Sequence, residues 1–145
     1  MRLFLLSLTV VTLVGCAPGA PRLYRGAMNE ELMIVVEPKG RSEMISHVIF
    51  AKPQRRSSGD YARLDIRKGV DCKAGELSMK DVSAYSPSGA LINTVSKPAG
   101  WTPAEGSETI ALRIVCDRKF AAARTLNGRL DQIAAFYRTE VAKAS

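Results

Sequence analysis

Apolar and polar residues alternate over much of the middle of the chain, and this pattern is typical of half-buried β-strands. Between the first two such runs lies the segment PKGRS, whose Pro38 and Gly40 are turn formers, so a hairpin is predicted there. A loop around Gly75 and the turn SPSG separate later runs. The predicted strands are residues 30–37, 43–52, 61–72, 77–85 and 90–97. Strands in this order with short connections predict an antiparallel meander.

The third predicted strand indicates which of its faces points inward. One face is apolar, interrupted only by Lys68, and carries Ala62, Leu64, Ile66, Val70 and Cys72. The opposite face is polar and carries Tyr61, Arg63, Asp65, Arg67 and Asp71. The alternation therefore predicts that Cys72 faces the core.

After Trp101 the pattern admits helix as well as strand. Residues 107–116 fit a helix in which Ser107 is the N-cap and Glu108 lies in the first turn. The same letters also alternate as a strand, through Ile110, Leu112, Ile114 and Cys116. The helix is the favoured interpretation, and the strand stays open.

The tail places apolar residues at helical spacing, with lysine and arginine late in the segment where they suit the helix dipole. These positions are Leu130, Ile133, Phe136 or Tyr137, and Val141. A C-terminal helix is therefore predicted, and the region 118–145 is assigned to it. The fold class follows as α+β: a small antiparallel sheet of about five strands, packed by one or two helices.

The start of the chain reads as an export signal. Residues 3–14 are apolar, with Arg2 before them and Gly15 after them. Twelve helical residues rise roughly 18 Å, too little to span a hydrocarbon core of about 30 Å. The tetrapeptide Leu13-Val14-Gly15-Cys16 resembles the bacterial lipobox, which implies cleavage before Cys16 and attachment of lipid to its thiol. An ordinary signal peptide cut elsewhere is the alternative.

The lipobox resemblance implies the division of the chain into segments and the location of the protein in the cell. Residues 1–15 are the lipoprotein signal peptide, and 16–29, rich in small residues and proline, are a flexible tether. Two or three acyl chains on Cys16 would hold the protein on the membrane essentially permanently. Ala17 is not an aspartate, and in enteric-type sorting this implies passage to the outer membrane.

If Cys16 carries lipid, Cys72 and Cys116 remain, an even number of thiols in an exported chain, and this predicts one disulfide.

The single His47 and two distant cysteines do not make a zinc ligand set, so no metal or other cofactor is expected. Ser107 has no G-x-S-x-G elbow around it and no partnered histidine. A hydrolase is therefore disfavoured, and the chain is expected not to be an enzyme.

The cysteines and their surroundings resemble the surface-adhesin protein E-like domain of bacterial lipoproteins. The matching positions are Asp71, Cys72, Tyr85, Gly89, Trp101, Ser107 and Cys116. The similarity covers 61–116, and the domain is assigned to 30–117. It implies a small sheet-plus-helix fold with a cysteine bridge. It also implies binding of extracellular-matrix and serum proteins, as in the best-studied members, although many relatives are envelope lipoproteins of unknown role.

Charge adds a hint about partners. The formal net charge is +7, and removal of Arg2 with the signal leaves +6. A basic exported domain is attracted to anionic lipid headgroups or acidic polymers, and the candidate residues are Arg55, Arg56, Arg63 and Arg67. The bland interpretation is that this charge serves solubility near the membrane.

Two functions remain in view. The first is a lipid-anchored binding module that is adhesive to host or extracellular ligands, and the second is a periplasm-facing structural or accessory subunit of an envelope assembly. The expected partners are the membrane, through lipid on Cys16, and a protein ligand or an anionic envelope component. A second copy of the chain is a further candidate partner, whereas nucleic acid is not expected in that compartment.

Overall fold

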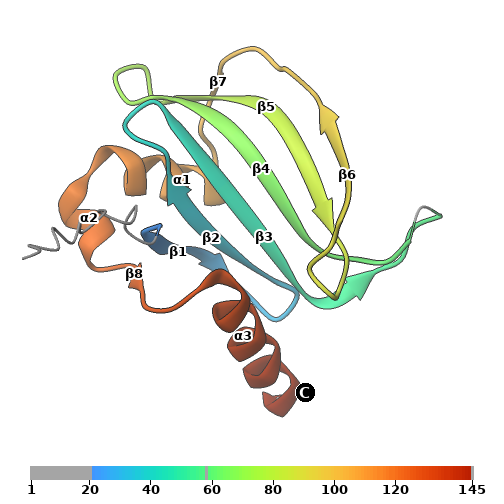
Figure 1. Cartoon of the computed structure of the whole chain (residues 1–145). Helices are drawn as coiled ribbons and strands as arrows, with labels where there is room; N and C mark the ends of the chain where they lie inside the picture. The colour runs from blue at the N-terminus through green and yellow to red at the C-terminus, as the bar shows by residue number, and fades with distance from the viewer. Residues whose placement is uncertain (1–20, 58, 145) are drawn as a thin grey trace, which may run out of the picture.

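The computed structural model describes residues 21–57 and 59–144. In this part of the chain eight strands form one antiparallel sheet, and three helices accompany it (Figure 1). The strands are β1 (Leu23–Met28), β2 (Leu32–Pro38), β3 (Glu43–Gln54), β4 (Tyr61–Asp71), β5 (Glu76–Tyr85), β6 (Leu91–Ser96), β7 (Thr102–Pro103) and β8 (Thr125–Leu126). The helices are α1 (Ser107–Cys116), α2 (Arg118–Ala122) and α3 (Leu130–Ala144). The α+β class is confirmed.

The sheet keeps the predicted meander at its centre. Its order is β6-β5-β4-β3-β2-β1-β8, and β7 pairs with β5 outside this path. Strands β2 and β3 form the predicted hairpin, in register from Leu32 opposite Phe50 to Pro38 opposite Met44. Gly40 in the hairpin turn has φ 85°, a left-handed conformation that glycine adopts without steric cost.

The two faces of the sheet carry separate cores. Val35 and Val36 are neighbours in β2, and both are fully buried because adjacent strand residues point to opposite faces. Val35 belongs to the cluster that α3 covers with Ile133, Ala134 and Tyr137. Val36 belongs to the cluster that α1 covers with Ala111 and Ile114. Figure 1 shows α1 and α2 grouped together and α3 set apart from them.

The tether prediction is wrong for residues 23–28, which form β1. The strand pairs with β2 through a register shift between Arg25 and Met28, and Leu23 is buried. Gly26 helps it to fit, because a Cβ there would lie 3.0 Å from the carbonyl oxygen of Ile34. The alternation of apolar and polar residues in this segment is too short to predict a strand. The sheet therefore contains strands beyond the five that were predicted. The expected signal peptide and Cys16 lie outside the described residues.

The C-terminal region also departs from the prediction. Residues 107–116 are the helix α1, which settles the choice between helix and strand. Gly106, and not Ser107, is its N-cap residue, and no side chain caps it. The helix predicted within 118–145 is confirmed from Leu130 to Ala144 only. Before it come α2 and β8, the latter pairing with β1.

The buried members of both core clusters lie between Leu23 and Tyr137. A chain that starts at Ala17 therefore contains the whole core found among the described residues.

Candidate functional site

The disulfide between Cys72 and Cys116 is confirmed, with the two Cα atoms 5.6 Å apart. It joins the residue after β4 to the last residue of α1, so it fastens the helix to one end of the sheet. Both cysteines are exposed, and the prediction that Cys72 faces the core is wrong. The alternation stops at Asp71, where the chain turns and the Asp71 carboxylate accepts hydrogen bonds from the next backbone amides.

Lys68, the one charge on the apolar face of β4, has a structural role. Its side chain is buried, and its ammonium group pairs with the carboxylate of Glu108 in the first turn of α1. A buried charge is costly unless it is paired. This ion pair therefore explains why a lysine can occupy that face, and it is a second link between β4 and α1.

The four candidate arginines are divided by the structure into two pairs. Arg55 and Arg56 are exposed in the β3–β4 loop, and the Arg56 guanidinium lies 5.7 Å from the centre of the Tyr61 ring. No carboxylate in residues 21–57 or 59–144 forms an ion pair with either arginine. These two cations are therefore available to an anionic partner.

Arg63 and Arg67 lie on β4 and already have anionic neighbours. Arg63 Nε is 2.9 Å from Asp65 Oδ1, and the guanidinium stacks 3.9 Å from the centre of the Tyr85 ring. Arg67 Nε lies 3.4 Å from Asp81 Oδ2 and 3.8 Å from Glu43 Oε1. Neighbouring carboxylates offset much of the charge of this pair, so the structure does not bring the four arginines into one basic patch.

A buried histidine between two carboxylates was not anticipated. His47 is 4% exposed. Its Nδ1 lies 2.8 Å from Asp65 Oδ1, and its Nε2 lies 3.2 Å from Glu37 Oε2. Its neighbours on β2 and β4 are Val35 and Asp65, so the meeting of these side chains depends on strand register. The sequence pattern does not specify register, which explains why this cluster was missed.

The electrostatic environment of Glu43 is set by the neighbouring strands. The pKa of Glu43 is held below its ordinary value, chiefly because the Lys80 ammonium donates a hydrogen bond to the carboxylate. Arg67 and Lys39 add weaker attraction. The arrangement belongs to an ion-pair network on the sheet surface.

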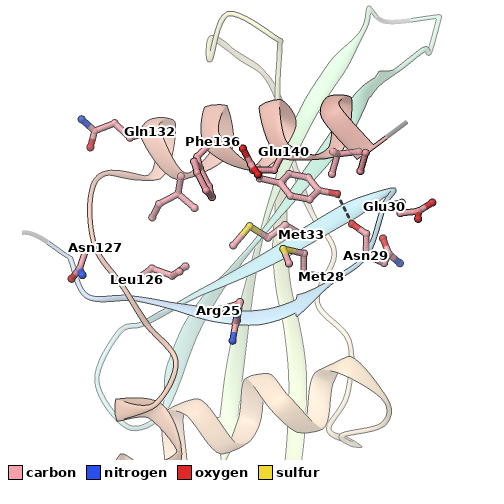
Figure 2. A pocket seen from close by; sticks show the side chains of 14 residues that line it. Arg25, Met28, Asn29, Glu30, Met33, Leu126, Asn127, Gln132, Phe136 and Glu140 are labelled. Carbon is pink, nitrogen blue, oxygen red and sulfur yellow. Dashed lines mark hydrogen bonds between the residues drawn. The ribbon is translucent and has the colours of Figure 1, made fainter.

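A cleft of about 830 Å³ lies between α3 and β1 (Figure 2). Its apolar walls come from β1, β2, β8 and α3, and they include Met28, Met33, Leu126, Ile133, Phe136 and Val141. A hollow of this size falls within the range of about 300–1,000 Å³ that is usual for small-molecule sites. No residue predicted from the sequence as a binding residue lines it.

The phenol that lines the cleft already has a hydrogen-bond partner. The Tyr137 hydroxyl donates a 2.9 Å hydrogen bond to the Asn29 carbonyl oxygen, as the dashed line in Figure 2 shows. Burial raises the pKa of Tyr137 above its ordinary value, so the phenol stays neutral and remains a donor. The next residue of α3, Arg138, ties the helix to the sheet by donating to the carbonyl oxygens of Phe50 and Ala62, each at 3.0 Å.

No family model matches the chain, and no curated protein or solved structure matches it. Among residues 21–57 and 59–144, no group of three histidine, cysteine or carboxylate side chains could hold a metal ion. No helix in those same ranges has the length and apolar character needed to cross a membrane.

Proposed function

We propose that the protein is a non-enzymatic, lipid-anchored lipoprotein of the cell envelope, most simply at the outer membrane, and that it acts as a binding module. The lipobox at Leu13-Val14-Gly15-Cys16 supports the anchor. The disulfide between Cys72 and Cys116 is in keeping with an exported domain. The resemblance to the protein E-like domain supports an adhesive role toward host or extracellular ligands.

The observation that carries the binding role is the pair Arg55 and Arg56 in the exposed β3–β4 loop. Their charges have no carboxylate partner among the described residues, whereas those of Arg63 and Arg67 do. Cations without partners attract phosphate or carboxylate surfaces at little cost in lost internal pairing. We therefore assign contact with an anionic envelope component or acidic ligand to this loop. Arg63 and Arg67 contribute only to the long-range positive potential of the domain.

The test is co-sedimentation of the chain from Ala17 onwards with vesicles containing anionic lipid. Arg55→Gln with Arg56→Gln should weaken binding strongly while leaving stability nearly unchanged, because exposed loop charges contribute little to folding. The matched control is Arg41→Gln with Arg118→Gln, which removes the same charge from two other exposed positions. Binding should fade between low and physiological salt, as the screening length falls from roughly 30 Å to about 8 Å.

Two results would contradict the assignment to the loop. Absence of binding at low salt would leave the net charge as a solubility feature. An equal loss in the control double variant would mean that total charge, and not the loop, drives the attraction.

The second candidate function is a periplasm-facing structural or accessory subunit of an envelope assembly. The sheet surface carries both signs of charge close together, at Arg67, Glu43 and Asp81, and such a mixed surface suits a specific polar contact with a protein neighbour better than attraction to a uniformly anionic surface. Protease treatment of intact cells separates the two functions. An adhesive module at the cell surface is cleaved, whereas a subunit that faces the periplasm is protected until the outer membrane is opened.

A further inference from the structure

The cleft between α3 and β1 has an unusual rim. Met28 on β1 and Phe136 on α3 flank it and are 56% and 68% exposed. Other apolar residues of α3, such as Ile133 and Tyr137, are buried in the core below, so Phe136 is not needed to fill it. Figure 2 shows Phe136 and Met28 on opposite sides of the hollow. The rim therefore presents apolar surface on both sides of an apolar floor.

The interior offers little to a peptide backbone. A buried peptide group needs hydrogen-bond partners, and leaving one unsatisfied is costly. The Tyr137 hydroxyl already donates to Asn29, the Gln132 side-chain oxygen already accepts a hydrogen bond from a backbone amide, and the lining residues Met33 and Ile133 are apolar. Methionine side chains are flexible and polarizable, so they adapt to irregular apolar shapes. These features favour a hydrocarbon chain over a polypeptide as the occupant.

The charges at the rim are distributed asymmetrically. Arg25 lines the cleft from β1, and no carboxylate in the described ranges forms an ion pair with it. Glu140 lies across the hollow in Figure 2 and is paired with Lys143 at 2.8 Å. Glu30, the remaining acid of the lining, lies beyond Asn29 at one end. Arg25 is thus the cation that an anionic group at the mouth would meet.

We propose that this cleft binds a free long-chain fatty acid, with the hydrocarbon chain between α3 and β1 and the carboxylate at Arg25. A single chain suits a hollow of about 830 Å³ with apolar walls. The site is separate from the β3–β4 loop and does not depend on the lipid anchor. If the proposed anchor at Cys16 is correct, the seven residues from it to Leu23 span at most about 25 Å. The cleft then stays near the membrane, which is a source of fatty acids.

The test is a fluorescence titration of the chain from Ala17 onwards with cis-parinaric acid, a polyunsaturated fatty acid that fluoresces in apolar sites. Saturable binding is expected, and Met28→Gln with Phe136→Gln should weaken it at least tenfold. The matched control is Leu91→Gln with Val95→Gln on β6, where the side chains are 57% and 51% exposed and lie outside the cleft. That control should bind as the unchanged chain does.

The position of the headgroup has its own test. Arg25→Gln should weaken binding of the fatty acid at least threefold and leave binding of the alcohol with the same hydrocarbon chain unchanged. An equal effect on both ligands would overturn the placement of the carboxylate.

Other results would overturn the site itself. These are absence of saturable binding, or full affinity in the variant with both Met28 and Phe136 replaced. Sedimentation should show the same oligomeric state in this variant and in the unchanged chain. A dimer that becomes a monomer on these replacements would show that a second copy of the chain occupies the cleft instead.

Discussion

Removing the cross-link between Cys72 and Cys116 should destabilise the domain by a defined amount. The two cysteines are 44 positions apart, and the chain-entropy model gives about 4 kcal/mol for a loop of this length. The total stability of a domain of this size is about 5–15 kcal/mol, so the bridge is a large fraction of it.

The loss of stability on removing the disulfide can be measured without a second effect from the serine side chains. Because Cys72 and Cys116 are both exposed, serine at either position remains hydrated and adds no buried polar group. The packing of Ala111 and Ile114 and the Lys68–Glu108 ion pair do not involve the sulfur atoms, so they still hold α1 to the sheet. Each single serine variant should therefore lose about 4 kcal/mol, and the double variant should lose no more.

Urea denaturation gives the free energies, with the fluorescence of Trp101 as the signal. Trp101 is the single tryptophan, and its ring lies close to Gly69 of β4, so it reports on the sheet. Reduction of the unchanged protein should reproduce the same loss. Additive losses in the double variant, or free thiols in the folded protein, would refute the reasoning.

Four further substitutions test the packing and the charges. Gly69→Ala should lower stability by more than about 1 kcal/mol in the same urea assay, because its Cβ would lie 2.5 Å from Ser78 Oγ and 3.1 Å from the Trp101 ring, so that rotation of Ser78 alone does not make room; unchanged stability would contradict this close approach. The lowered pKa of Glu43 means that its contribution is present above pH 4.5 and is lost as the pH falls below it. Glu43→Gln or Lys80→Gln should therefore flatten the loss of stability in acid, and an unchanged acid profile would count against the Lys80 hydrogen bond. The raised pKa of Tyr137 means that stability falls as the pH rises above 10.0, and Tyr137→Phe should reduce that slope in alkaline melts. If Tyr137→Phe loses stability with rising pH as steeply as the unchanged protein, the raised pKa of Tyr137 is refuted.

Strong local patterns predicted the centre of the fold. The β2–β3 hairpin was readable because two alternating runs flank Pro38 and Gly40. Helix α3 was readable because Leu130, Ile133 and Val141 follow the helical period. The disulfide followed from the even number of cysteines that remain once Cys16 is set aside, in a chain that is expected to be exported.

Features that depend on distant pairing were not readable. Strand β1 is short and contains Gly26, and it forms because β2 and β8 supply hydrogen-bond partners from both sides. The contacts of His47 depend on strand register, and the α3–β1 cleft joins segments about a hundred residues apart. The exposure of Cys72 depends on the end of β4 at Asp71, a boundary that alternation alone does not specify.

The most direct test of the lipid anchor is mass spectrometry of the amino terminus of the protein extracted from membranes. The mature chain is expected to begin at Cys16 and to carry diacylglycerol on its thiol, with a further acyl group on the new amine. Cys16→Ser should remain an unprocessed or unanchored precursor. A mature chain that begins at another residue, or one that begins at Cys16 without lipid, would show that Cys16 is not a lipid anchor.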